Sequence, residues 1–388
     1  MASPMADSKP GSQPSQVVLD EEKGRVRVVT LNNPRKLNII SREVVIRLTE
    51  IYEKWEKEND AEMIIIKGAG RAFSAGGDLR VFYYGKADKH VIEAVYKMYW
   101  LQYHIHTYKK TLVAIVNGLA IGGGASITVA STFKVVTEKT VLSAPEAGFG
   151  FHTDASLSYI LSHLPGHLGE YLALTGARLD GAEMIATGLG THYIPSEKLE
   201  DLEKRLVDLN SGDRNIVRAA MEEFSLQVQP GEKSILYNRS LIAKCFSKDT
   251  VEEIIETLIA ENNMEGNEWV KDTIQNLKRS SPTGLKMTLR SVRQARKQTL
   301  SECLKKEFRL TINTLRGVIS NDIYEGMRAL VIDKDNSPKW NPPLSEVTEE
   351  KLDLVFSSFE EEFELQLPQE EKISRWEGKF ECSGFHLE

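Results

Sequence analysis

The sequence has few cysteines and no long apolar run. The three cysteines among its 388 residues, Cys245, Cys303 and Cys382, are far apart and form no Cys-x-x-Cys pair. This spacing excludes a disulfide framework and a thiolate zinc site, and it indicates a reducing compartment. No apolar stretch approaches the roughly 18 residues that a membrane-spanning helix needs, so no membrane association is expected.

Recognisable targeting signals are also lacking. The first 16 residues are rich in serine and proline and have no apolar centre, so residues 1–16 are expected to be disordered and resemble neither a signal peptide nor an Arg-rich transit peptide. The final residues, His386 to Glu388, do not form a Ser-Lys-Leu peroxisomal address. The cytoplasm is therefore the default location, and the sequence leaves the peroxisome and the mitochondrion open.

An excess of positive charge is missing as well. The net charge is -7, and the segment from Glu346 to Glu371 alone contributes -9, with ten acids against Lys351. The rest of the chain is therefore close to neutral, at about +2, which gives no electrostatic support for binding nucleic acid. The acidic segment is expected to be a solvated face.

The sequence does contain an alternation of strand and helix patterns. Strands are predicted at 25–31, 63–67, 112–116 and 133–136, and helices at 41–58, with Ser41 as N-cap, and at about 87–107. After about residue 201 only helical patterns follow. The sequence predicts an α/β core domain at 17–230, a helical C-terminal region at 231–358 and an acidic tail at 359–388.

Two glycine-rich turns follow buried strands and precede predicted helices. They are Phe73-Ser-Ala-Gly-Gly-Asp78 and Asn117-Gly-Leu-Ala-Ile-Gly-Gly-Gly124. Backbone N–H groups at such helix starts can bind a ligand oxygen, and glycine permits the close approach. Either turn alone could be purely structural. Neither matches a phosphate-binding loop or the G-x-G-x-x-G pattern, so a nucleotide site is not indicated.

Two carboxyl residues, Glu146 and Asp154, lie among small and apolar residues in the segment Ala144 to Asp154. Such a setting raises the pKa of a carboxyl group and suits it to acid, base or nucleophilic chemistry. Glu146 could also be an ordinary acid in the first turn of a helix.

The order of these motifs resembles the enoyl-CoA hydratase/isomerase (crotonase) superfamily. The C-terminal motifs Ser281-Pro-Thr-Gly-Leu-Lys286, Glu325-Gly-Met-Arg-Ala329, Ile332-Asp-Lys-Asp335 and Pro338-Lys-Trp340 resemble its 3-hydroxyisobutyryl-CoA hydrolase branch. The resemblance covers about residues 17–358. It implies a crotonase-like ββα spiral core with a helical C-terminal region, and an acyl-CoA substrate.

The resemblance also implies roles for individual residues. The backbone N–H groups of Ala75 and Gly123 would form an oxyanion hole, and Glu146 and Asp154 would be the catalytic acids. Ser126 stands where hydratases carry a catalytic Glu, which disfavours hydration. Substrate contacts are expected from a further set: Lys36, Gly76, Gly77, Asp78, Gly122 and His152. A basic stretch at 278–297 either faces the CoA 3′-phosphate or is a solvated helix face.

The expected activity is hydrolysis of 3-hydroxyisobutyryl-CoA or a related short 3-hydroxyacyl-CoA, a reaction of valine catabolism. Glu146 would attack the thioester or activate a water, and Asp154 would bind the 3-hydroxyl or the water. No metal and no separate cofactor is expected, because CoA is part of the substrate. The sequence leaves a homo-oligomer open.

Five residues depart from the hydrolase pattern. Met98 replaces an acid, His152-Thr153 replaces Phe-Pro, and Ala155-Ser156 replaces glycines. These departures keep two alternatives open, another crotonase reaction such as isomerisation by Glu146 alone, and an acyl-CoA-binding paralogue without turnover.

Overall fold

A computed structural model describes residues 16–265 and 267–368. A six-stranded sheet forms the base of the fold, in the order β1-β2-β3-β5-β7-β10. Its strands are β1 (Val18–Lys23), β2 (Val26–Leu31), β3 (Met63–Gly68), β5 (Thr111–Val116), β7 (Phe133–Val136) and β10 (His192–Tyr193). Only the β1–β2 pair is antiparallel. The four strands predicted from the sequence all lie in this sheet.

A second sheet of four short strands carries the glycine turns. Its order is β4-β6-β8-β9, from β4 (Ala72–Ser74), β6 (Leu119–Ile121), β8 (Val141–Ser143) and β9 (Leu179–Asp180). The first three strands are parallel, so their carboxyl ends meet at one edge. Ala75, Gly122 and Glu146 follow these strands closely, and the edge therefore gathers the predicted site residues.

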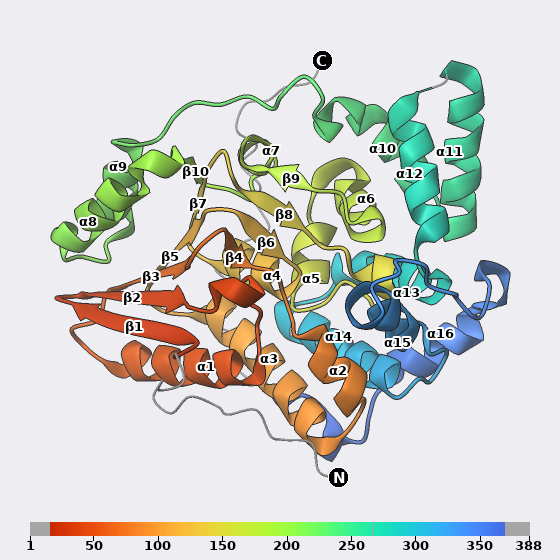
Figure 1. The fold of residues 1–388 in the computed structure, drawn as a ribbon, viewed down its shortest axis with the longest axis horizontal. Coiled ribbons are helices and arrows are strands. Elements are labelled where there is room, and N and C mark those ends of the chain that lie inside the picture. Colours follow the sequence, from red (N-terminus) through yellow and green to blue (C-terminus); the bar gives the residue numbers. More distant parts are fainter. Residues whose placement is uncertain (1–15, 266, 369–388) are drawn as a thin grey trace, which may run out of the picture.

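Sixteen α-helices of the described chain surround and extend the sheets (Figure 1). In the first half they are α1 (Arg42–Lys57), α2 (Leu79–Gly85), α3 (Lys89–Thr107), α4 (Gly123–Ala130), α5 (Leu157–Ser162), α6 (Leu168–Thr175), α7 (Gly181–Ala186) and α8 (Leu199–Leu209). In the second half they are α9 (Arg214–Glu222), α10 (Arg239–Phe246), α11 (Val251–Glu265), α12 (Glu268–Arg279), α13 (Pro282–Ala295), α14 (Leu300–Leu315), α15 (Asp322–Met327) and α16 (Glu349–Phe356).

Helix α1 begins directly after the capping residue predicted from the sequence. The Ser41 hydroxyl accepts a hydrogen bond from the Val44 N–H at 3.4 Å and caps the helix, as predicted. The apolar residues of α1 recur at helical spacing, and Leu48 and Trp55 are fully buried. They pack against the sheet strands and α3 in one apolar cluster.

The C-terminal helices pack directly on the α/β core. One hydrophobic cluster joins residues of α5 and α6 with residues of α10 to α13, so burial continues across residue 230. Helix α14 lies along α3, and Figure 1 shows α13 to α16 gathered on one side of the sheets. The helical character predicted after residue 201 is confirmed, because only helices, 3₁₀ turns and one π turn follow α8 in the described chain.

The acidic segment is only partly a solvated face. Phe359 and Leu365 pack in the cluster of α3 and α14, and Leu365 is fully buried. Arg309 Nε donates to Glu364 Oε1 at 2.7 Å. The expectation of a purely solvated segment is therefore wrong for its described part, because apolar residues between the acids anchor it. The predicted disorder of residues 1–15 and the tail after residue 368 lie outside the described residues.

None of the described helices combines the length and apolar character that crossing a membrane would require. Both described cysteines, Cys245 and Cys303, are free and buried.

Candidate active site

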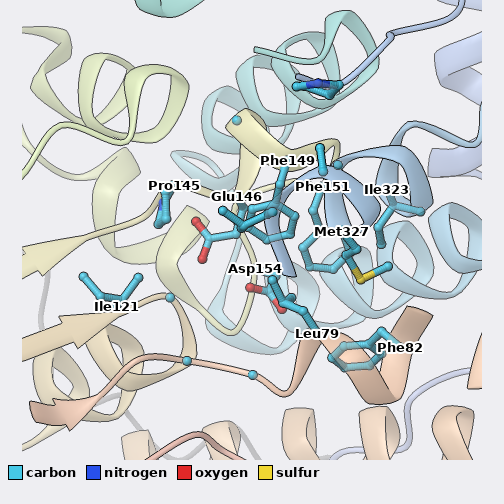
Figure 2. A pocket seen from close by; sticks show the side chains of 18 of the residues that line it. Leu79, Phe82, Ile121, Pro145, Glu146, Phe149, Phe151, Asp154, Ile323 and Met327 are labelled. Atoms are coloured by element: carbon cyan, nitrogen blue, oxygen red, sulfur yellow. The ribbon is translucent and has the colours of Figure 1, made fainter. Parts of the chain in front are cut away.

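A cavity of about 700 Å³ opens at the edge where β4, β6 and β8 end. Its lining combines the two glycine turns, the Glu146 turn and residues from α2, α3, α14 and α15. Figure 2 shows the Glu146 and Asp154 side chains at its centre, Ile121 and Pro145 on one side, and Leu79, Phe82, Ile323 and Met327 on the other. Residues from distant parts of the chain thus form one pocket.

The glycines of both turns permit tight packing around this cavity. Gly122 has φ of 51°, and a Cβ there would lie 2.7 Å from Glu146 Oε1. Gly76 has φ of 87°, and a Cβ there would lie 2.9 Å from the Ile121 carbonyl oxygen. A side chain at position 122 would collide with Glu146, and one at position 76 would push the two turns apart. By contrast, a Cβ at Gly123 would meet no atom within 4 Å, so its backbone borders open space.

Residues of both turns line the cavity, but the Ala75 N–H does not fit the predicted role. Gly123 is the first residue of α4, where N–H groups lack partners within the helix. The Ala75 N–H instead donates to the Leu37 carbonyl at 2.9 Å. Gly77, two residues later, lines the cavity. It forms an isolated parallel β-bridge with Ile40, in which the Gly76 carbonyl accepts a hydrogen bond from the Ile40 N–H at 2.8 Å. The Ala75 N–H therefore already has a partner, whereas Gly77 lies in the cavity wall.

Glu146 is a buried carboxyl without a compensating charge. It begins a 3₁₀ turn, Glu146–Phe149, and is only 4% exposed. Its Oε2 atom has no hydrogen-bond partner among the described residues. Burial, together with the nearby Glu307 carboxylate, raises the pKa of Glu146 to about 8. The raised pKa predicted from the sequence is confirmed, and it suits a group that exchanges protons near neutral pH.

Asp154 lines the same cavity and is 8% exposed. Burial and then the Glu146 and Glu307 carboxylates raise the pKa of Asp154 well above its usual value. Both raised pKa values favour the protonated carboxylic acids, and ionisation of Glu146 near its pKa of about 8 supplies a carboxylate at this site.

Ser126, at the position of the hydratase Glu, is not available to a ligand. Its hydroxyl lies in α4, fully buried, and donates to Gln102 Oε1 at 2.8 Å and to the Ala155 carbonyl. It does not line the cavity. The site therefore has no third acid facing Glu146 and Asp154 from α4.

Of the remaining predicted contacts, Gly76, Gly77 and Gly122 line the cavity, whereas Lys36, Asp78 and His152 do not. Lys36 is exposed in a short 3₁₀ turn. The Asp78 side chain caps α2 by accepting from the Arg80 N–H at 3.2 Å. These side chains contribute to the turn and its surface rather than to the cavity wall.

His152 belongs to a buried hydrogen-bond network behind the wall. Its Nε2 atom lies 2.9 Å from Thr311 Oγ1, which is 2.8 Å from the Tyr99 hydroxyl. Burial and the charge of Lys306 lower the pKa of His152 to about 3, so the ring is neutral at physiological pH. The residue supports Thr311, which does line the cavity, and it is not in a position to touch a ligand.

The basic stretch divides into two groups. Lys278 and Arg279, at the end of α12, are exposed and line the cavity. Four others pair with carboxylates: Lys286 with Glu252, Arg290 with Asp353 and Glu349, and Arg293 and Arg296 with Glu170. Lys297 does not line the cavity. The interpretation as a phosphate-facing group is therefore restricted to Lys278 and Arg279.

The sequence reasoning missed most of the apolar wall. Leu79, Phe82, Phe151, Ile323 and Met327 line one end of the cavity and come from three separate segments. Their spacing along the chain gives no periodic signal that joins them. Met98 was singled out as a departure, and its side chain lies in this wall. No cluster of three or more His, Cys, Asp or Glu side chains able to hold a metal occurs within 16–265 and 267–368.

The two sheets and the surrounding helices form an α/β fold, and comparisons with known proteins identify its family. A solved structure, a carnitinyl-CoA dehydratase from Mycobacterium thermoresistibile, matches with a TM-score of 0.83 and 32% identity, over 92% of this chain and all of that one. The crotonase-like fold predicted from the sequence is confirmed. The family model described as enoyl-CoA hydratase/isomerase matches residues 26–356. The chain belongs to this family.

Two curated relatives from Arabidopsis thaliana narrow the branch. The chain is 60% identical over 372 residues to a 3-hydroxyisobutyryl-CoA hydrolase-like protein 5, covering 95% of this chain and 96% of the relative. It is also 42% identical over 362 residues to the small ribosomal subunit protein mS47, covering 90% and 88%. The resemblance to the hydrolase branch is confirmed, and the second relative bears a non-enzyme name.

Proposed function

We propose that the protein is an acyl-CoA thioester hydrolase that acts on 3-hydroxyisobutyryl-CoA or a related short 3-hydroxyacyl-CoA. The observation that carries the proposal is the pair of buried acids, Glu146 and Asp154, facing the glycine turns at the ends of β4 and β6. The names of relatives such as the Arabidopsis hydrolase-like protein support the reaction class. The coenzyme A group is part of the substrate, and a homo-oligomer remains a prediction.

In the proposed mechanism the thioester carbonyl oxygen accepts hydrogen bonds from the N–H groups of Gly77 and Gly123. Such donors stabilise the charge that develops on the oxygen, by about 10²–10³ in rate for each donor. Lys278 and Arg279 lie at the cavity rim, where they would face the phosphates of CoA. The apolar wall of Leu79, Phe82 and Met327 would then enclose the acyl group.

Glu146 breaks the thioester by one of two routes. Its carboxylate attacks the carbonyl carbon, the CoA thiolate leaves, and water opens the resulting anhydride; or the carboxylate removes a proton from a water that attacks directly. Both routes consume one water and yield a free acid and free CoA thiol. Asp154 would hold the 3-hydroxyl of the substrate or the attacking water.

Two other functions make different predictions. Isomerisation by Glu146 alone would move a double bond without releasing thiol. A non-catalytic paralogue would bind acyl-CoA without turnover, and the relative named mS47 shows that family members with a non-enzyme name exist. The retained pair Glu146 and Asp154 at one cavity favours the hydrolase.

One experiment separates these functions. Free thiol release is measured for a panel of short acyl-CoAs and crotonyl-CoA, together with acyl-CoA binding by calorimetry and enoyl absorbance. We expect thiol release from 3-hydroxyacyl-CoAs and no steady, enzyme-dependent loss of enoyl absorbance, because Ser126 leaves hydration without its second acid. Binding without thiol release would support the paralogue, and double-bond movement would support the isomerase.

A further inference from the structure

Glu307 is a fully buried carboxyl group on α14 that takes no part in the proposed chemistry. It does not line the cavity, so it has no contact with a bound substrate. Its Oε2 accepts the Ser156 N–H at 2.7 Å, and its Oε1 accepts the Ser158 N–H at 3.2 Å and the Ser158 hydroxyl. Every one of these partners lies in the segment directly after Asp154.

The segment that Glu307 contacts has an unfavourable backbone conformation. Ala155 has φ of 54° and Ser156 has φ of 73°, both in the left-handed region, which is unfavourable for a residue other than glycine. Ser156 is also the N-cap of α5, yet its side chain makes no capping hydrogen bond. The turn therefore needs support from outside, and the Glu307 carboxylate supplies it at the helix start.

We infer that Glu307 is a positioning residue: it holds the turn Ala155–Ser158 and thereby aims the Asp154 carboxyl group into the cavity. Only the expected effect of Glu307 on turnover rests on the proposed function. Without Glu307 the N–H groups of Ser156 and Ser158 would be buried without a partner, and the turn would relax toward ordinary φ values. Asp154 precedes this turn directly, so its side chain would move with it.

Glu307→Gln tests the inference with little change in volume. The amide replaces one carboxylate oxygen by an NH₂ group, so only one of the two backbone N–H groups keeps its acceptor. Because a displacement of about 1 Å near the reacting atoms can cost about 10²-fold, we expect kcat to fall about 10–100-fold while KM stays within about threefold. A matched control is Glu170→Gln, which removes another fully buried carboxylate, on α6, that pairs with Arg296.

A double-mutant cycle distinguishes positioning from general destabilisation. If Glu307 acts through Asp154, Glu307→Gln should lower kcat by less than about twofold in an Asp154→Asn background. Additive losses would overturn the inference, because a role in overall stability would not depend on Asp154.

Hydrogen exchange of the backbone amides tests the same inference without turnover. We expect the Ser156 and Ser158 amides to exchange at least about tenfold faster in Glu307→Gln and at native rates in Glu170→Gln. Unchanged exchange would overturn the inference even if the native protein proved not to be a hydrolase, whereas absent turnover alone would overturn only the proposed function. If Glu307→Gln fails to fold, Ser158→Ala removes a single donor to the same carboxylate, and a smaller acceleration at Ser156 is expected.

Discussion

Glu146 and Glu170 are both buried carboxyl groups, but they have opposite surroundings. Glu170 is fully buried and lies 2.7 Å from Arg296 Nη2 and 2.9 Å from His167 Nδ1. The Oε2 atom of each group has no hydrogen-bond partner among the described residues, but Glu146 also has no ion pair there. The charge of Glu170 is compensated by a cation, whereas the uncompensated Glu146 resists ionisation and is available for chemistry.

The largest effect that we expect from removing either carboxyl group is on turnover. Glu146→Gln keeps the volume and removes the ionisable group, so we expect thioester hydrolysis to fall by about 10²–10⁴-fold while CoA binding is largely retained. Glu170→Gln should leave kcat within about threefold, because its partners lie away from the cavity. Thiol release and calorimetric binding of CoA measure the two effects. Near-normal turnover in Glu146→Gln would contradict the assignment of this residue.

The second prediction concerns Asp154 and the acyl group. Asp154 faces a wall that is otherwise largely apolar, so a substrate without a 3-hydroxyl would leave this carboxyl group without a partner (Figure 2). We expect kcat/KM for 3-hydroxyisobutyryl-CoA to exceed that for isobutyryl-CoA by at least about tenfold, and Asp154→Asn to reduce this ratio. Equal kcat/KM values in the native protein would mean that Asp154 does not bind the hydroxyl.

Positions 152 and 153, which depart from the hydrolase pattern, do not contact the acyl pocket. Both residues are fully buried and absent from the cavity lining. His152→Phe would remove the partner of Thr311, and Thr153→Pro would remove the Thr153 N–H that donates to Thr288 Oγ1 at 3.2 Å. Any change in substrate preference from these substitutions would therefore be indirect and would arise through Thr311 in the cavity wall.

The third prediction concerns pH. If hydrolysis requires the ionised form of Glu146, whose pKa is raised to about 8, kcat/KM should rise with pH up to that region, by nearly tenfold for each pH unit well below it. The rise should be absent from the residual activity of Glu146→Gln. A profile that is flat between about pH 5 and pH 9 in the native protein would show that Glu146 does not act as a base or nucleophile.

Much of the fold could be predicted from local signals. The four strands of the larger sheet and helix α1 with its Ser41 cap follow from alternation, helical spacing and a capping residue. The strands β4, β6 and β8 could not be predicted, because three-residue strands carry no measurable period. Their parallel pairing depends on the larger sheet that positions them.

The site was predictable to a smaller extent. Glu146, Asp154 and Gly123 were found because glycine turns and isolated acids stand out in a sequence. The predicted role of the Ala75 N–H does not fit the structure because this group donates to the Leu37 carbonyl, and that pairing is not visible in the motif. The partners of Glu307 lie about 150 residues away, so only the tertiary structure connects it with the site.

The smallest predicted effect is on stability, and it has an unusual sign. The folded-state pKa of Glu146, about 8, lies above its usual value of 4.5, so the folded protein holds a proton that the unfolded chain releases. The contribution of this group to the free energy of unfolding is fully present below the unfolded-state pKa and is lost as the pH rises through the folded-state pKa. Glu146→Gln should therefore melt about 2–4 °C above the native protein at about pH 9 and at nearly the same temperature at about pH 4.5.

Glu170→Gln should melt below the native protein at about pH 7, because it breaks a balanced pair. Thermal unfolding of the three proteins across this pH range measures the difference, and a lower melting temperature for Glu146→Gln at high pH would show that the Glu146 carboxylate is stabilised by partners in the folded state.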